Sequence, residues 1–159
     1  VSTKDLNTFK GCINQIDLPS VFRRCKSDRV IYVPKPLSFD VSIYKQYANC
    51  CNEVDLATAI EIAIELYPAV LPFVPCFLRS KNLYAWNICI LRKDYFNELY
   101  GFVFNILFAF EKARKVLHYL PYQARDISFL AERLCHLWFE CARATKPIQL
   151  VECPIVFYG

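Results

Sequence analysis

The chain has 159 residues, of which 55% are hydrophobic and 16% are aromatic, and its formal net charge is +4. This apolar content excludes disorder over most of the length, because enough surface can be buried to offset the entropy lost on ordering the chain. The basic residues are scattered and lack the dense patch typical of nucleic-acid binding, so no nucleic-acid partner is expected, although peripheral contact with an anionic membrane surface is compatible with them.

The sequence contains neither a membrane-spanning segment nor a pattern of metal ligands. The longest apolar run, 99–110, contains Asn105 and is shorter than the roughly 20 residues that a spanning helix needs. The 9 cysteines and 2 histidines include no C-x-x-C pair, so no metal site is predicted. Cys89, Cys135 and Cys141 have apolar neighbours and are expected to be core residues in a reducing, cytoplasmic compartment.

The first half of the chain is predicted to be mostly helical after a polar start. Residues 1–27 form a poorly defined lead-in with a short helical candidate at 18–25. The β-branched run 29–33 predicts a buried strand that ends at Pro34. The helices predicted after it, from apolar spacing and from the prolines that end them, cover 42–50, 55–66 and, as a broken helix or turn, 69–78.

The second half alternates between strands and helices. The apolar run 83–91, interrupted only by Asn87, has the length and composition of a strand that is covered on both faces. Asp94 offers an N-cap for a long helix over 95–115, which should be buried because its middle is apolar on nearly every side. The elements predicted beyond it are a strong helix over 123–142 and a strand over 148–157.

These elements predict one α/β or α+β domain over 1–159, with about three strands and four or five helices. Three strands covered on both faces make a small sheet with unpaired edges. We therefore expect further strands from sequence upstream of Val1. The sequence also has no methionine, which favours a chain that begins inside a longer reading frame.

The helix over 123–142 carries the pattern that suggests chemistry. One side is apolar and predicts the core face, while Arg125, Phe129, Glu132 and His136 lie on the other side at helical spacing, flanked by Arg133. A carboxylate, a guanidinium and an imidazole together could move a proton and bind an anion. Periodicity alone favours a solvated face on which Glu132 and His136 form an ordinary surface pair. The exposed aromatic ring that this would require argues against it.

Several blocks of residues resemble a known family. The most specific are Pro121-Tyr122-Gln123-Ala124-Arg125 and Phe129-Leu130-Ala131-Glu132-Arg133-Leu134. Further similar blocks lie at 28–34, 44–47, 87–91 and 104–108, so the similarity runs from about residue 28 to residue 138. These blocks resemble a bacterial family known as domain of unknown function 4422, which is associated with glycosyltransferases of capsule and lipopolysaccharide gene clusters.

The resemblance implies the carboxy-terminal part of a nucleotide-sugar-dependent glycosyltransferase with a partial GT-A-like sheet. The family's amino-terminal portion has no counterpart here. By analogy, that missing half would hold most contacts to the nucleotide-diphosphate-sugar donor and any Mn²⁺ or Mg²⁺ ion, so the isolated chain is expected to be inactive. The implied partners are the missing half, the sugar donor and a glycan acceptor, and the implied location is the cytoplasm, at the inner face of the plasma membrane.

Carried over residue by residue, the resemblance makes Glu132 the candidate general base that deprotonates an acceptor hydroxyl, a role typically worth about 10²–10⁴-fold in rate. The candidate substrate-binding residues are Arg125 or Arg133 for the leaving diphosphate, and Tyr122, Gln123 and Asn87 for sugar hydroxyls. For Asn87, a buried amide satisfied by the backbone is an equally weighted alternative. Tyr84 and Trp86 could stack on a sugar, although core packing is favoured for both.

Two interpretations without catalysis stay open. One is a helical module that only docks a partner, and the other is an inactive remnant of a transferase. A docking surface would more often show an exposed apolar stripe with charged rims. The polar stripe from Arg125 to Glu132 therefore favours the enzyme.

Overall fold

The structure is a computed structural model and describes residues 29–114 and 126–154. The described strands are β1 (Val30–Pro34), β2 (Leu37–Ser38), β3 (Asn82–Leu83) and β4 (Gln149–Cys153). The described helices are α3 (Ile43–Cys50), α4 (Glu53–Leu66), the 3-10 helix η1 (Pro68–Phe73), α5 (Val74–Arg79), α6 (Lys93–Ala113) and α7 (Asp126–Thr145). The helix expected at 18–25 and the residues Tyr122, Gln123 and Arg125 lie outside the described residues.

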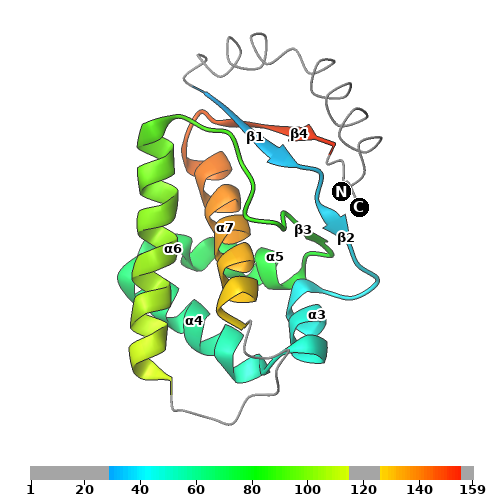
Figure 1. The fold of residues 1–159 in the computed structure, drawn as a ribbon, viewed down its shortest axis with the longest axis vertical. Coiled ribbons are helices and arrows are strands. Elements are labelled where there is room, and N and C mark those ends of the chain that lie inside the picture. Colours follow the sequence, from blue (N-terminus) through cyan, green and yellow to red (C-terminus); the bar gives the residue numbers. More distant parts are fainter. Residues whose placement is uncertain (1–28, 115–125, 155–159) are drawn as a thin grey trace, which may run out of the picture.

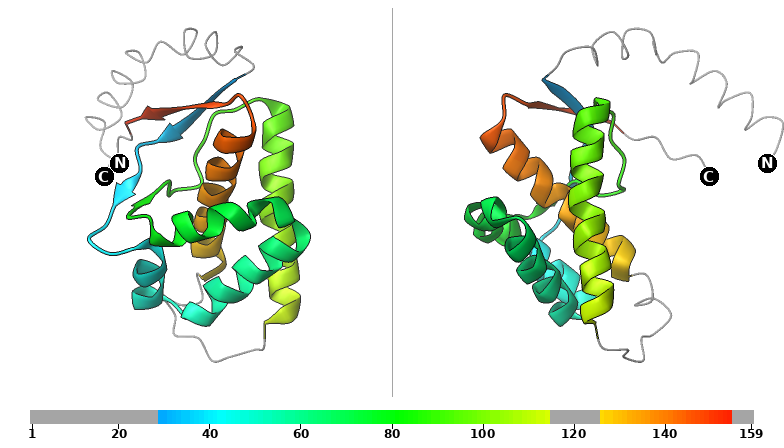
Figure 2. Two further views of the ribbon diagram at one scale, coloured as in Figure 1. Left: turned by 180° about the vertical axis from the view of Figure 1, so that it is seen from behind. Right: turned by 90° about the vertical axis from the view of Figure 1, so that its left-hand side faces the viewer.

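Helix α7 runs through the middle of the helical part. Figure 1 shows α6 alongside α7, and the view from behind in Figure 2 shows α4, η1 and α5 crossing another face of α7. The segment between β3 and α6 passes on the side of α7 away from α4 and α5, and β1 and β4 lie across one end of the helices (Figures 1 and 2). Because neighbours surround it, every residue of α7 from Arg133 to Phe139 is buried.

Strands β1 and β4 pair in parallel, although most of the described chain lies between them. The register runs from Val30 opposite Gln149 to Pro34 opposite Cys153. The strand predicted at 29–33 is confirmed, and the strand predicted near the end of the chain is confirmed as β4. With its two small sheets and its helices, the architecture is α/β and largely helical, as the sequence predicts.

The strand predicted over 83–91 is wrong as a continuous element. Only its beginning, in β3, is a strand, which pairs with the short β2 so that Leu83 lies opposite Leu37. Farther along, Ile90 forms an isolated antiparallel bridge with Tyr32 of β1, with both backbone hydrogen bonds at 2.9 Å. The run therefore begins in the β2–β3 pair and, near its end, contacts the middle of β1 in the other sheet.

A turn in the middle of this run breaks the strand. Trp86 has a φ of 75° and Asn87 a φ of 49°, and a left-handed pair of this kind occupies the central positions of tight turns, not of a strand. The backbone N–H groups of Tyr84 and Trp86 donate to side chains on α7. Tyr84 donates to His136, and Trp86 donates to Glu132. Side chains of a helix thus replace the neighbouring strand that a ladder would need.

The helix boundaries follow local sequence signals with one exception. The hydroxyl of Ser42 caps α3, and the side chain of Asn52 caps α4; both are preferred N-cap residues. The N-cap of α6 is Arg92, not Asp94 as expected. Asp94 lies in the first turn instead, where its charge complements the helix dipole. The broken helix predicted over 69–78 is confirmed as η1 and α5, which meet next to prolines.

Helix α6 is buried on one side only, so the expectation of a wholly buried helix is wrong. Its inner face includes Ile106 and Phe110, each at most 1% exposed, whereas Phe104 and Phe108 on the outer face are 47% and 59% exposed. The rings of Phe96, Tyr100, Phe104 and Phe108 follow one another at one-turn spacing with centroids 4.5, 5.8 and 5.9 Å apart. We call these four residues the aromatic row. Within the described ranges, no helix is both long and apolar enough to cross a membrane.

Candidate functional site

The polar residues of α7 point into the protein. Arg133 and His136 are each 3% exposed, and the side chain of Glu132 is 17% exposed. The interpretation of a solvated surface stripe is therefore wrong, for a reason that periodicity does not reveal: the segment 83–92 covers this side of α7, so the helix has a second buried face. Buried polar groups need hydrogen-bond partners, and the contacts of each of these side chains define the candidate site.

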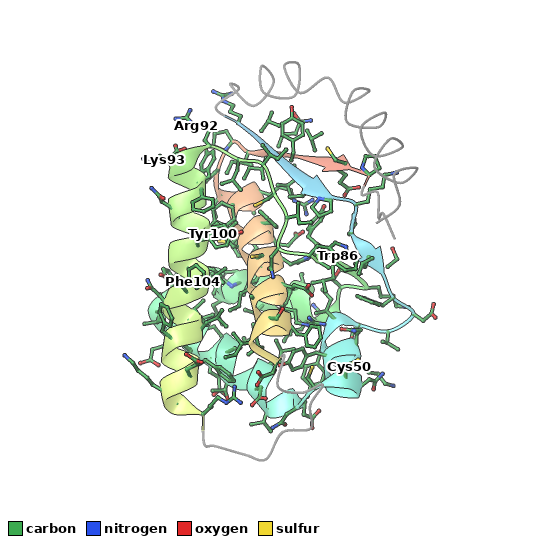
Figure 3. All side chains as sticks on the ribbon, viewed as in Figure 1. Cys50, Trp86, Arg92, Lys93, Tyr100 and Phe104 are labelled. Carbon is green, nitrogen blue, oxygen red and sulfur yellow. The ribbon has the colours of Figure 1, made fainter. Side chains whose placement is uncertain are left out.

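Glu132 holds the turn at Trp86. Its Oε1 accepts a hydrogen bond from the backbone N–H of Trp86 at 3.2 Å, and its Oε2 lies 3.7 Å from Nη1 of Arg133. In Figure 3, Trp86 lies to one side of α7 and Tyr100 of the aromatic row to the other. Trp86 is exposed, with 39% of its surface open to solvent, and an exposed aromatic ring can stack on a sugar.

Arg133 connects α7 to α3. Its guanidinium donates to the carbonyl of Phe129 at 2.8 Å and to Oε1 of Gln46, and it lies over the ring of Tyr47 with 4.9 Å to the centroid. Burial is the largest influence on this guanidinium and lowers its pKa from the ordinary value, while Glu132 acts in the opposite direction. Nη1 and Nη2 of Arg133 are therefore directed to internal partners, whereas its buried Nε has no hydrogen-bond partner among the described residues.

Asn87, in the turn, contacts both α7 and α6. Its Oδ1 accepts from the thiol of Cys135 at 3.5 Å, and its backbone carbonyl accepts from the hydroxyl of Tyr100 at 3.5 Å. Burial raises the pKa of Cys135 to about 12 and that of Cys89 to about 11. Both cysteines are therefore neutral thiols, and Cys135 is a core residue as the sequence predicts.

His136 has a fixed tautomer. Its Nδ1 accepts a hydrogen bond from the backbone N–H of Tyr84 at 2.9 Å; a backbone N–H can only donate, so Nδ1 carries no proton. Burial, with a further contribution from Arg143, lowers the pKa of this imidazole to about 4. The ring is therefore neutral at pH 7, and its proton is on Nε2, which lies 3.9 Å from Oε1 of Glu140.

A polar cleft opens beside His136. It has a volume of about 340 Å³ and lies between α5, the second half of α7 and strand β4. The hydroxyl of Tyr84 donates to Oε1 of Glu152 at 2.9 Å, which helps burial to raise the pKa of Tyr84 to about 12. The polar lining of the cleft includes Ser80, Asn82, His136, Glu140, Arg143 and Glu152.

Sequence reasoning found only part of this arrangement. The structure places Glu132 next to Arg133 and to the turn that contains Asn87, whereas Tyr122, Gln123 and Arg125 lie outside the described residues. Glu140 and Arg143 were missed, although they continue the line of His136 at steps of four and three along α7 and could have been found by extending the stripe. Glu152 is on a strand remote in sequence, and no local signal marks it.

The candidate site contains no metal-binding arrangement in the part of the chain that the structure describes. No group of three or more His, Cys, Asp and Glu side chains there is placed to hold a metal ion. Zinc sites generally have three or four protein ligands of this kind.

Comparisons with known proteins identify relatives of this fold. A family described as "Domain of unknown function (DUF4422)" matches residues 5–143. Among solved structures, the apo structure of the WbbM bifunctional glycosyltransferase is similar with a TM-score of 0.75 and 26% sequence identity, over 82% of this chain and 24% of that protein. The chain thus spans about a quarter of that protein's length. No curated protein sequence matches the chain significantly.

Proposed function

The chain belongs to the DUF4422 family, and from this premise we propose that it is the carboxy-terminal part of a nucleotide-sugar-dependent glycosyltransferase acting in capsular or lipopolysaccharide glycan synthesis. The observation that carries the proposal is the similarity to a solved bifunctional glycosyltransferase over most of this chain. It supports a glycosyltransferase-like fold. The nucleotide-sugar donor, the glycan acceptor and a cytoplasmic location at the inner face of the plasma membrane belong to the proposal.

In this proposal Glu132 is the general base. An inverting transfer needs a carboxylate that accepts the proton of the acceptor hydroxyl as that oxygen attacks the sugar carbon. Glu132 offers such a carboxylate at the turn that carries the exposed Trp86, and its hydrogen bond to the backbone leaves other lone pairs available. The turn at Trp86 and Asn87 fixes the direction of the carboxylate, which favours a reaction that depends on orientation.

The remaining candidates take substrate-binding roles. Of the two arginines, Arg125 is the better choice for the leaving diphosphate, because Arg133 is buried and its Nη1 and Nη2 are bonded to Phe129 and Gln46. Arg133 instead holds α7 against α3. Tyr122 and Gln123 stay proposed ligands of sugar hydroxyls, and Asn87 could join them through its amide N–H groups.

A second candidate function is that of a docking module. The aromatic row on α6 favours it, since Phe104 and Phe108 form an exposed apolar stripe and Lys93 and Lys112 lie toward the ends of the same helix. Exposed aromatic stripes with charged rims are typical of interaction surfaces. This surface is compatible with the enzyme as well, because a transferase can also bind partner proteins.

The experiment that tests the proposal measures transfer. The full-length protein that contains this chain is incubated with a panel of nucleotide-diphosphate-sugars and glycan acceptors, with and without Mn²⁺, and the release of nucleoside diphosphate is followed. We expect acceptor-dependent release from the full-length protein and none from residues 1–159 alone. Failure of the full-length protein with every donor would reject the enzyme and leave the docking module.

A further inference from the structure

The cleft beside His136 is not used by the proposed proton transfer. Its volume of about 340 Å³ falls within the range of small-molecule sites, which begin at roughly 300 Å³. It lies along α7 from Glu132, and His136 follows Glu132 by one helical turn, about 6 Å along the helix axis. The cleft is therefore reached one turn of α7 beyond the proposed base, which is not itself part of the cleft lining.

The cleft contains one hydrogen-bond donor that is fixed by the fold. Because Nδ1 of His136 is occupied by the backbone N–H of Tyr84, the Nε2–H group is directed toward the cleft side of the ring. Its nearest acidic neighbour, Glu140, is 3.9 Å away, which is too far for a hydrogen bond. His136 is 3% exposed, so its ring cannot turn away to find another partner without disrupting the core.

Two carboxylates from different elements line the cleft together with this donor. Glu140 of α7 binds Nη2 of Arg143 at 2.8 Å, and Glu152 of β4 accepts from the hydroxyl of Tyr84. Each carboxylate has further lone pairs, which can accept hydrogen bonds from hydroxyl groups. A fixed N–H donor between carboxylate acceptors is an arrangement that suits a molecule with several hydroxyls, each of which can both donate and accept.

The charge of the cleft distinguishes between the two substrates of a transferase. Glu140 and Glu152 contribute two negative charges, Arg143 contributes one positive charge, and His136 is neutral at pH 7, which leaves one net negative charge. Arg143 is already paired with Glu140. Diphosphate sites rely on unpaired arginine and lysine groups, and like charges at close range disfavour binding.

We infer that this cleft binds a neutral, hydroxyl-rich saccharide, the non-reacting part of the glycan acceptor, and excludes the nucleotide diphosphate of the donor. His136 donates through Nε2–H, and the carboxylates of Glu140 and Glu152 accept from sugar hydroxyls. The half-buried ring of Phe73 provides an apolar wall for the sugar's C–H groups. That this saccharide is the glycan acceptor rests on the proposed function, but the binding of a saccharide can be tested without it.

The direct test is saccharide binding to the full chain. The methyl glycosides of galactose, mannose, N-acetylglucosamine and rhamnose are titrated separately, as is uridine diphosphate, and the imidazole nitrogens are followed by ¹⁵N NMR. At least one glycoside should shift the Nε2 signal of His136 while Nδ1 keeps its unprotonated shift, and uridine diphosphate should leave Nε2 unchanged. If no glycoside shifts Nε2, or if only the nucleotide does, the inference is wrong.

Isosteric variants assign the acceptors. Glu140→Gln and Glu152→Gln remove one charge each and should each weaken glycoside binding about tenfold, the effect of losing one charge-assisted hydrogen bond. Glu65→Gln, on the exposed side of α4, is the matched control and should bind normally. Thermal unfolding of each variant checks that the fold is intact. Unchanged binding in both cleft variants would overturn the assignment.

The same variants in the full-length transferase separate the two proposals. The acceptor KM should rise about tenfold while the donor KM stays within about twofold, as expected for lost acceptor binding alone. Normal transfer with unchanged acceptor KM would reject the cleft and leave the transferase. Absence of transfer from the wild-type protein, together with glycoside binding that depends on Glu140 and Glu152, would reject the transferase and leave the cleft as a saccharide site.

Discussion

The carboxylate of Glu132 accepts a hydrogen bond at 3.2 Å from the backbone N–H of Trp86, a residue with a φ of 75°. A bulky residue in the left-handed region typically costs on the order of 1–3 kcal/mol and persists only where its surroundings enforce it. Such strained positions cluster at binding and catalytic sites. Glu132 therefore has a structural role that any test of catalysis must separate from chemistry.

Two substitutions at Glu132 separate these roles. In Glu132→Gln the amide oxygen can still accept from Trp86, so the free energy of unfolding should change by less than about 1 kcal/mol, whereas transfer by the full-length enzyme should fall by about 10²–10⁴-fold. Glu132→Ala loses the acceptor as well and should destabilise the fold by about 1–3 kcal/mol. Urea unfolding and initial-rate assays give the two readouts. Near-normal turnover of Glu132→Gln would remove the base role and leave Glu132 as the residue that positions the turn.

The buried His136 should make stability depend on pH. Its pKa is lowered to about 4 in the folded protein and is about 6.5 in an unfolded chain, so the unfolded state binds the proton first as the pH falls. The stabilisation is fully present above about pH 6.5 and is lost between there and about pH 4. The free energy of unfolding should therefore drop by about 2–3 kcal/mol between pH 7 and pH 4.5 from this group alone.

The variant His136→Asn isolates that contribution. Its side-chain oxygen can accept from the N–H of Tyr84, but it does not titrate in this range. The pH dependence of urea unfolding should be shallower in His136→Asn than in the wild type, while the effect of carboxylates and of His118 is common to both proteins. Equal pH dependence in the two proteins would show that the pKa of His136 is not lowered in the folded state.

Cysteine reactivity should follow burial. Cys76 is exposed, whereas Cys51 and Cys135 are buried, and burial also raises the pKa of both buried thiols. Because the thiolate is the reactive form, iodoacetamide at pH 8 should label Cys76 within the time in which Cys135 stays unmodified, as read by peptide mass spectrometry. Labelling of Cys135 without urea, at a rate similar to that of Cys76, would contradict the described core.

Two phenylalanines on α6 provide a matched pair for stability. Phe110 is 1% exposed and Phe108 is 59% exposed. Phe110→Ala should cost about 3–5 kcal/mol because it opens a cavity in the core. Phe108→Ala loses mainly the stacking on Phe104, at 5.9 Å, and should cost less than about 1 kcal/mol. Urea unfolding compares them, and a large cost at Phe108 would mean that the aromatic row is covered.

The sequence predicts most helices because their signals are local. The apolar spacing of α4, its Asn52 cap and the following Pro68 lie within the helix or next to it. The run 83–91 fails for the opposite reason, since its composition is that of a strand while its shape depends on acceptors about 50 residues away on α7. Nothing in a tryptophan side chain indicates a positive φ, so the turn at Trp86 could not be foreseen.

The sequence placed Glu132 and His136 on one face of a helix but did not predict what surrounds that face. Periodicity correctly grouped Glu132 and His136 on one face of α7 but assigned that face to solvent, because a sequence pattern shows which residues share a side and not what covers it. The second half of the cleft depends on Glu152, which reaches Tyr84 only through the pairing of β4 with β1. Contacts of this range arise from the tertiary fold.

The parallel pairing of β1 with β4 has a consequence for biosynthesis. Val30 must wait for Gln149 to leave the ribosome before the two strands can join, so the helices between them can form and pack while this sheet is still open. Closing so long a loop makes the contact slow and entropically costly. Until it closes, the backbone edge of β1 is available to other chains, so low synthesis temperatures and chaperones that shield nascent strands should raise the yield of folded protein.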